Sequence, residues 1–327
     1  MKNIVFTLCS NNYLAHAKTL GDSVLAVDPS VSFVIGLVDR RDPSIDYGFF
    51  SNFEIVDCES IGFPVFEEMI KRYNVIEFNT AVKPFYLEYL LKRCGSGAKV
   101  YYVDPDIVWF GSFDRLNSIL KNQSIVLTPM LTVPSASVTT DELVALRHGM
   151  YNLGFIGTAY SDETFRFLEW WKERLKAHCV IDKRRGLFVD QKWVDIATLF
   201  FQDINVLRDV GYNMAWWNLA ERTLMKSGSS YFVNNKDCEL IFFHFSGYKV
   251  GSDYFTGRMN NPKYLLTSRP DLIEIFRDYS QRLISNRYTQ LSKLKPLLPF
   301  VPLASGSKTL TSRAKAKVKG LMKKIVK

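Results

Sequence analysis

Short apolar runs alternate with amphipathic stretches along the N-terminal third of the chain. Tyr13–Val27 and Thr80–Arg93 both repeat apolar residues with the period of a helix, so both segments are predicted helices. The runs between them are rich in β-branched and aromatic residues, which predicts strands at Ile4–Leu8, Val31–Val38, Glu54–Val56 and Lys99–Val103. Strands that alternate with helices in this way predict an α/β fold, with a mostly parallel sheet covered by helices on both faces.

The same patterns continue through the rest of the chain, and the predicted elements are strands at 125–128, 153–157 and 240–245 and helices at 165–175, 191–201 and 272–284. Prolines interrupt the apolar run Leu297–Leu303, and a Ser-Gly-Ser joint follows it. Residues 296–307 are therefore a predicted linker after one domain of residues 1–295. In residues 308–327, apolar side chains recur on one helical stripe among lysines, which predicts a basic amphipathic C-terminal extension.

Composition places the chain among globular proteins. It has 327 residues, 47% of them hydrophobic and 23% charged, and no stretch reaches the roughly 18 apolar residues that a membrane helix needs. The five cysteines are scattered and include no Cys-x-x-Cys pair, which favours a reducing compartment over a disulfide framework or a zinc site. These features exclude disordered and multi-span membrane proteins, and we expect the body of the protein in the cytoplasm.

The formal net charge of +9 has a local origin. Residues 308–327 carry eight lysines and arginines and no acidic residue, so nine minus eight leaves +1 for residues 1–307. Cations beside an apolar stripe suit an anionic membrane surface, where each contributes on the order of 1 kcal/mol. We expect the extension to hold the protein peripherally on the inner face of the cell membrane, with a solvated, disordered tail as the alternative. Nucleic acid is not an expected partner, because the extension lacks interleaved aromatic residues that would stack on bases.

Two acidic residues directly follow the predicted strand that ends at Val103. Asp104 and Asp106 therefore lie at the carboxyl end of a strand, where ligands bind in open α/β sheets. Two carboxylates presented by one turn suit a divalent cation that also binds phosphate oxygens. His244 ends another apolar run and would complete a set of oxygen and nitrogen ligands suited to Mn²⁺ or Mg²⁺. A solvated Asp-Pro turn and a hydrogen-bonded core histidine are the alternatives.

The order of several motifs resembles one enzyme family. A strand followed by Asp-x-Asp at 104–106, Asn-x-Gly at 152–154, Asp-Gln at 190–191 and a late His-x-x-Gly at 244–247 looks like the GT-A-fold nucleotide-sugar glycosyltransferases. The resemblance is closest to the glycogenin-like and bacterial lipopolysaccharide group. It implies a GT-A, Rossmann-like fold and the transfer of a hexose from a nucleoside-diphosphate sugar, with UDP-sugar favoured. The implied acceptor is a glycan or lipid-linked saccharide in bacterial surface polysaccharide synthesis, and the implied outcome is retention of configuration.

The resemblance also implies roles for individual residues. Asp104, Asp106 and His244 would hold the metal ion, Mn²⁺ or Mg²⁺, and Asp104 would also contact the ribose. Asp190 and Gln191 would be the catalytic pair near the anomeric carbon. The other donor-binding residues that the resemblance implies are Thr7, Cys9, Asn11 and Tyr13 in the nucleoside loop, Lys83 on the preceding helix, Asn152 and Gly154 along the sugar, and Gly247 and Lys249 at the diphosphate.

The chain departs from the family pattern at two points. Lys249 follows Gly247 with one spacer fewer than usual and without the Pro-Trp that normally comes next, and Lys192 follows Gln191 in place of an acidic residue. The diphosphate role of Lys249 and the donor sugar therefore stay open. Two rival functions also remain. One is a haloacid-dehalogenase-type phosphatase with Asp104 as the nucleophile, and the other is a non-catalytic membrane- or nucleic-acid-binding module.

Overall fold

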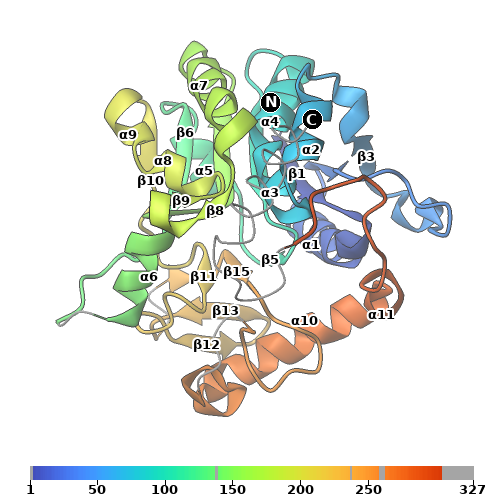
Figure 1. The fold of residues 1–327 in the computed structure, drawn as a ribbon. Helices are drawn as coiled ribbons and strands as arrows, with labels where there is room; N and C mark the ends of the chain where they lie inside the picture. Colours follow the sequence, from blue (N-terminus) through green and yellow to red (C-terminus); the bar gives the residue numbers. More distant parts are fainter. Residues whose placement is uncertain (1–2, 137–138, 236–237, 258–261, 304–327) are drawn as a thin grey trace, which may run out of the picture.

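A seven-stranded sheet forms the centre of the molecule, in the order β10-β6-β7-β4-β1-β2-β3 (Figure 1). The computed structural model describes residues 3–136, 139–235, 238–257 and 262–303, so the predicted extension 308–327 lies outside the described residues. Neighbouring strands are parallel except at β7, which is antiparallel to β4 and β6. The predicted mostly parallel sheet is confirmed. Its strands are β1 (Asn3–Cys9), β2 (Ser32–Leu37), β3 (Glu54–Asp57), β4 (Lys99–Val103), β6 (Ile125–Pro129), β7 (Tyr151–Ala159) and β10 (Ile204–Val206).

Helices cover both faces of this sheet. Successive strand residues point to opposite faces, so Phe6 and Tyr102 lie in one buried cluster, whereas Val5 and Tyr101 lie in the other. The first cluster packs against α2 (Phe66–Arg72), α3 (Val75–Ala81), α4 (Lys83–Cys94) and α7 (Asp162–His178). The second packs against α1 (Leu14–Val27) and α5 (Asp114–Ile119). The predicted α/β class is therefore confirmed on both faces.

The predicted helix Thr80–Arg93 is divided in the structure. α3 begins at a capping box formed by Asn74 and Glu77 and ends at Ala81, and α4 begins at Lys83 with Pro84 in its first turn. Proline has no N–H, so it cannot donate the backbone hydrogen bond that a continuous helix needs at this position. The break places Lys83 at the start of α4. The predicted helix 191–201 is likewise divided, into α8 (Gln191–Val194) and α9 (Ala197–Phe200).

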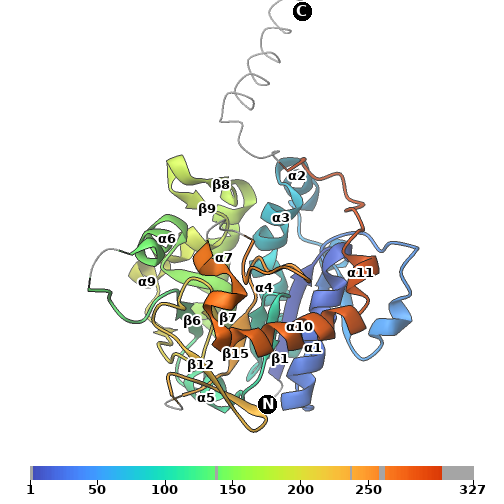
Figure 2. The same cartoon turned by 90° about the horizontal axis from the view of Figure 1, so that it is seen from below.

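A second, smaller sheet extends from the first. It has the order β11-β15-β5, and the turn at residues 104–106 connects β4 of the large sheet to β5 of the small one. Seen from below, α10 crosses under this part of the molecule (Figure 2), and its Phe276 and Tyr279 belong to the buried cluster behind β15. The remaining strands and helices are β5 (Ile107–Trp109), β8 (Ile181–Asp182), β9 (Leu187–Phe188), β11 (Met214–Ala215), β12 (Leu224–Ser227), β13 (Ser230–Val233), β14 (Cys238–Glu239), β15 (Phe242–His244), α6 (Thr140–His148), α10 (Ile273–Ser285) and α11 (Tyr288–Leu291).

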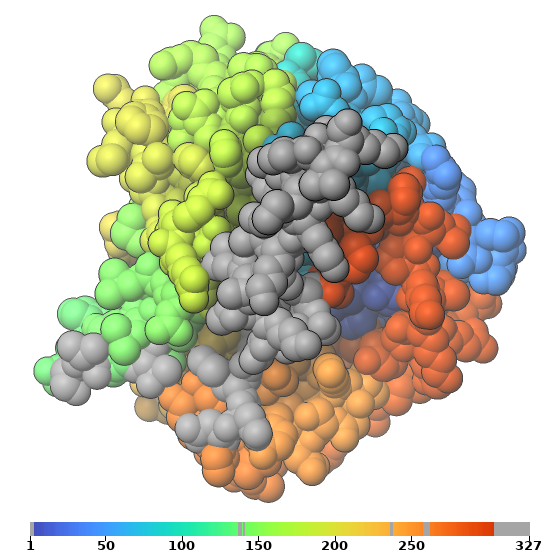
Figure 3. All heavy atoms as spheres, in the orientation of Figure 1, coloured from blue at the N-terminus to red at the C-terminus, as the bar shows by residue number. Residues whose placement is uncertain are grey.

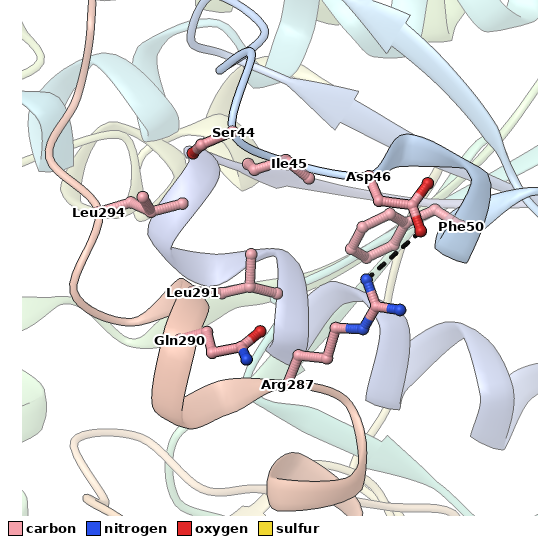
Figure 4. Close-up of a pocket in the computed structure, with 8 residues that line it drawn as sticks. All are labelled: Ser44, Ile45, Asp46, Phe50, Arg287, Gln290, Leu291 and Leu294. Carbon is pink, nitrogen blue, oxygen red and sulfur yellow. Dashed lines mark ion pairs between the residues drawn. The ribbon is translucent and has the colours of Figure 1, made fainter.

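Helix α11, the last helix of the described residues, packs against the N-terminal half of the chain. A cavity of about 90 Å³ lies between α11 and the loop after β2 (Figure 4). At its rim the Arg287 guanidinium lies 3.5 Å from the Asp46 carboxylate, and Phe50, Leu291 and Leu294 line its apolar side. This contact returns the chain to the edge of the large sheet before the predicted linker begins.

The first part of the predicted linker 296–307 lies against the domain. Leu298 is buried, and the backbone N–H groups of Leu297 and Leu298 donate to the Asp39 carboxylate at 2.9 and 3.0 Å. Further on, the Val301 N–H donates to the Tyr73 carbonyl. The boundary between domain and linker stays a prediction. Within the described part of the chain, none of the helices has the length and apolar character needed to cross a bilayer.

Candidate metal and donor site

The structure brings together the three side chains that the sequence suggests as metal ligands. One potential ligand atom from each of Asp104, Asp106 and His244 lies within 4.8 Å of the others. His244 Nε2 is 3.0 Å from an Asp106 carboxylate oxygen and 3.6 Å from one of Asp104. His244 is buried and both carboxylates are partly exposed. The cluster is therefore open on its acidic side and backed by the protein on its imidazole side.

Strand register places His244 beside the acidic turn. β15 pairs antiparallel with β5, with His244 opposite Ile107, and the Phe245 N–H donates to the Asp106 carbonyl at 2.8 Å. The Trp217 ring meets the imidazole edge-on, with centroids 5.2 Å apart. The pairing of β15 with β5 thus sets the position of His244, and Trp217 packs against its imidazole.

Gly154 lets the side chains of this cluster lie against the backbone of β7. The Gly154 carbonyl accepts the Asp104 N–H at 2.7 Å, which continues the β4–β7 pairing to the turn. A Cβ at this position would lie 2.6 Å from His244 Cε1, 2.7 Å from Asn152 Oδ1 and 2.9 Å from an Asp104 carboxylate oxygen. The two carboxylates and the imidazole of the cluster form a donor set that fits a divalent cation. The residues present therefore fit the metal that the sequence implies.

Tyr102 holds the carboxylate of Asp104 from behind. The two residues are separated by one position on the strand, so their side chains share a face, and the Tyr102 hydroxyl donates to Asp104 at 2.5 Å. Burial, followed by the Asp104 charge, raises the pKa of Tyr102 well above its usual range, so the hydroxyl keeps its proton. Sequence reasoning missed this residue, although its spacing from Asp104 is a usable signal.

Lys83 and Asp190 form a buried ion pair. Lys83 Nζ lies 2.5 Å from the Asp190 carboxylate, donates to the Leu153 carbonyl at 2.7 Å and stands 4.2 Å from the Tyr102 ring centroid. Both side chains are almost completely excluded from solvent. Burial raises the pKa of Asp190, and the Lys83 ammonium opposes that shift. Lys83 is therefore a buried, ion-paired residue and not a lysine on the solvent-exposed side of the helix. The roles suggested for Lys83 at the donor and for Asp190 in catalysis stay predictions.

Gln191 is bound to the strand that carries Asn152 and Gly154. Its side-chain oxygen accepts from the Asn152 amide at 3.2 Å and from the Leu153 N–H at 3.1 Å, and its amide donates to the His148 carbonyl. The Asn152 side-chain oxygen in turn accepts from the Gly154 N–H. The predicted catalytic pair and the predicted sugar-lining residues thus belong to one hydrogen-bonded network beside the metal cluster.

The predicted nucleoside loop is largely buried. Thr7 and Cys9 lie within or at the end of β1 with almost no exposure, and burial raises the pKa of the Cys9 thiol. The buried Asn11 amide donates to Asp39 at 2.9 Å, whereas Tyr13 is exposed and stacks on His16 with centroids 4.4 Å apart. Tyr13 is therefore the exposed member of this set, whereas Thr7, Cys9 and Asn11 are buried.

Asp39 is a residue that sequence reasoning missed. It follows β2 and is buried, with backbone N–H groups of Arg40, Leu297 and Leu298 and the Asn11 amide donating to its carboxylate. Burial raises its pKa against the effect of these donors. The signal in the sequence is an acidic residue directly after a strand, the same signal that drew attention to Asp104.

Gly247 and Lys249 lie in the turn after β15. Gly247 has a φ of +77°, a conformation that favours glycine, and its carbonyl accepts the Gly257 N–H. Lys249 is exposed, and its carbonyl accepts the Ser252 N–H. The structure therefore explains the glycine by the turn and leaves the Lys249 ammonium facing solvent.

Comparisons with known proteins find relatives of limited similarity. No family model matches the chain. The uncharacterized protein YfnF of Bacillus subtilis (strain 168) is 29% identical over 210 residues, which are 63% of this chain and 67% of that protein. The uncharacterized protein YfnD of the same strain is 24% identical over 176 residues, 53% of this chain and 54% of that protein. Neither relative brings a named activity to this chain.

Several solved structures that resemble this one are glycosyltransferases. The galactosyltransferase LgtC in complex with donor and acceptor sugar analogues has 14% identity and a TM-score of 0.49, over 90% of this chain and 97% of that chain. The apo form of GlyE from Streptococcus pneumoniae TIGR4 has 14% identity and a TM-score of 0.48, over 90% of this chain and 65% of that chain. The apo form of the bifunctional WbbM has 14% identity and a TM-score of 0.49, over 87% of this chain and 51% of that chain. An activity for this chain has to be argued from its own residues.

Proposed function

We propose that the protein is a metal-dependent glycosyltransferase that moves a hexose from a nucleoside-diphosphate sugar to a saccharide acceptor. The observation that carries the proposal is that Asp104, Asp106 and His244 lie together at the turn between β4 of the large sheet and β5 of the small sheet. This place is the carboxyl edge of a mostly parallel sheet, where α/β proteins bind ligands. The residues around it belong to the motifs that resemble GT-A glycosyltransferases.

In this proposal the donor's diphosphate binds at the metal cluster. Asp104, Asp106 and His244 would hold Mn²⁺ or Mg²⁺, which when bound supplies Lewis-acid stabilisation of negative charge on the leaving diphosphate. Tyr102 keeps the Asp104 carboxylate in place through its hydroxyl. The missing side chain at Gly154 lets Asp104 and His244 lie against the backbone of β7, where a larger residue would displace them. The end of β1 with Thr7 and Cys9, and Asn11 after it, would bind the nucleoside, and the exposed Tyr13 ring would lie against the base.

The sugar would lie along Asn152 and Gly154, with Asp190 and Gln191 toward its anomeric carbon. The Gln191 contact supports this arrangement because it fixes Asn152, which leaves little freedom to the side chain that would meet the hydroxyls. The Lys83 ammonium opposes the rise in the pKa of Asp190 that burial causes, and a negative charge on Asp190 beside the anomeric carbon would stabilise positive charge developing there. We favour UDP-sugar as the donor and retention as the outcome.

The acceptor would be a glycan or a lipid-linked saccharide of the bacterial cell surface. The basic extension 308–327 supports a lipid-linked acceptor, since eight cations beside an apolar stripe suit an anionic leaflet. In this arrangement the protein works on the cytoplasmic side of the membrane and is attached to it peripherally.

A donor screen tests this function without knowledge of the acceptor. UDP-, GDP- and dTDP-sugars are incubated with the protein, and slow hydrolysis is measured with Mn²⁺ and with a chelator. We expect metal-dependent hydrolysis of at least one donor and its loss in Asp106→Ala. Absence of hydrolysis for every donor would contradict the proposal, and a burst of phosphate from a model phosphate ester would favour the phosphatase alternative instead.

A further inference from the structure

A strongly basic hairpin projects from the body of the molecule. β8 and β9 pair antiparallel, with Ile181 opposite Phe188, and Lys183, Arg184 and Arg185 form the turn between them. All three cations are exposed, and the one acidic residue of the hairpin, Asp182, lies 3.9 Å from Arg185. Three positive charges and one negative charge leave +2 within eight residues of chain.

A fourth cation comes from another element. Arg147 lies near the end of α6, and its charge lowers the pKa of Lys183, after the larger effect of desolvation. His148, the next residue on α6, meets the Phe188 ring edge-on at 4.5 Å. The end of α6 and the hairpin therefore lie side by side and present their positive charges together.

Exposed aliphatic side chains accompany these cations. Ile181 is 44% exposed, and its backbone N–H donates to the Glu77 carboxylate on α3. The neighbouring α3 residue, Ile76, is 50% exposed, and Leu146 on α6, beside Arg147, is 70% exposed. A surface with exposed aliphatic side chains near its cations differs from an ordinary solvated charged surface, because burying the aliphatic side chains away from water is favourable.

The described chain ends close to this same place. The Val301 N–H donates to the Tyr73 carbonyl, and the Tyr73 hydroxyl accepts the Cys179 N–H just before the hairpin. The described chain ends two residues after Val301, at Leu303, which is 55% exposed. Figure 2 shows β8–β9 and α2–α3 at one end of the molecule, and Figure 3 shows the yellow-green hairpin region on the near surface.

We propose that this docking face, formed by the β8–β9 hairpin, the end of α6 and the start of α3, binds the surface of an anionic lipid bilayer. Four cations and three exposed aliphatic side chains on neighbouring elements match anionic headgroups above an apolar layer. The 24 residues beyond Leu303 contain the basic stripe, which would engage the same membrane as the docking face.

The docking face is close to the proposed catalytic residues along the chain. The hairpin ends at Phe188, and Val189 leads directly into Asp190. Contact between the hairpin and headgroups would therefore hold the site near the membrane, where a lipid-linked acceptor is available. The inference rests on the proposed function for this consequence, whereas binding to the bilayer itself is tested separately.

Vesicle sedimentation of the full-length protein tests the docking face. The probe is phosphatidylglycerol-containing vesicles, with pure phosphatidylcholine vesicles as reference. The test variant is Lys183→Ala/Arg184→Ala/Arg185→Ala, and the matched control Lys121→Ala/Arg277→Ala/Arg282→Ala removes equal charge after α5 and on α10, away from the hairpin (Figure 2). Each cation is worth about fivefold in partitioning, so the test variant should lose roughly 100-fold while the control stays within about twofold.

A second variant addresses the apolar part of the face. Ile181→Ser should weaken partitioning into phosphatidylglycerol vesicles several-fold. Unchanged partitioning of the triple variant, an equal loss in the control, or no binding of the wild type to these vesicles would overturn the inference. Metal-dependent donor hydrolysis without vesicles is measured in parallel and should be the same in wild type and triple variant. If no protein hydrolyses a donor, the proposed function fails, and the vesicle data still decide the docking face.

Discussion

The Lys83 ammonium and the Asp190 carboxylate are 2.5 Å apart and almost completely buried, and the ammonium lies 4.2 Å from the ring centroid of Tyr102, whose hydroxyl binds Asp104. A buried charge is strongly destabilising when its partner is removed, by about 3–5 kcal/mol. We therefore expect Lys83→Met to lower the free energy of unfolding by this amount, as measured by urea denaturation. The double variant Lys83→Met/Asp190→Leu should recover part of the loss because it leaves no unpaired charge. Equal stability of wild type and Lys83→Met would contradict the buried pair.

Gly154→Ala should remove metal-dependent ligand binding. The added methyl group would stand 2.6 Å from the His244 imidazole and 2.9 Å from the Asp104 carboxylate, so these ligands could not keep their positions. Isothermal titration with UDP and Mn²⁺ should show at least a tenfold loss of affinity, which is about 1.4 kcal/mol.

Gly157→Ala is the matched control for this variant. Gly157 is on the same strand, but its added Cβ would meet the Tyr101 ring at 3.0 Å, in the core and away from the metal cluster. It should lose some stability and keep its affinity for UDP and Mn²⁺. Loss of affinity in both variants alike would show that the effect is one of general packing.

Asp39→Ala should loosen the C-terminal segment. The substitution leaves the buried N–H of Leu298 and the partly buried N–H groups of Arg40 and Leu297 without their acceptor, and a buried unsatisfied group costs about 1–3 kcal/mol. Urea denaturation should therefore show a loss of at least about 2 kcal/mol. The control is Asp42→Ala, whose exposed carboxylate caps a turn at Ser44, and it should change stability by less than about 1 kcal/mol.

His16 should make stability dependent on pH. Burial lowers the pKa of His16 from 6.5 to about 4, against the opposing charge of Asp106. The unfolded chain therefore takes up a proton before the folded one does, and stability falls as the pH drops from 6.5 toward 4, by about 3 kcal/mol in total. His16→Phe should lack this part of the slope. Identical pH profiles of unfolding for the two proteins would exclude His16 as the cause.

The sequence predicts the large sheet and its helices well because their signals are local. Each strand is a short apolar run, and the acidic turn follows one of them directly, so Asp104 and Asp106 are found without a structure. The break at Val82 is less visible, since the apolar period continues across it and Pro84 is compatible with the first turn of a helix.

The partners of the site residues are harder to predict because they come from distant segments. His244 reaches Asp106 through the pairing of β15 with β5, and Lys83 reaches Asp190 across the core. The spacing of these residues along the sequence does not indicate that their side chains are in contact. Asp39 was missed because its partners are backbone N–H groups of the C-terminal segment, which carry no side-chain signature.

Thermal or chemical unfolding with UDP, with and without Mn²⁺, is the most direct test of the metal-bound donor site. A ligand at a hundredfold excess over its Kd stabilises a protein by about 2.7 kcal/mol. We predict a stabilisation of this size in the wild type only when UDP and Mn²⁺ are both present, and none in Asp106→Ala. Stabilisation by UDP that is unaffected by Mn²⁺ and equal in Asp106→Ala, or no stabilisation of the wild type at all, would contradict the account.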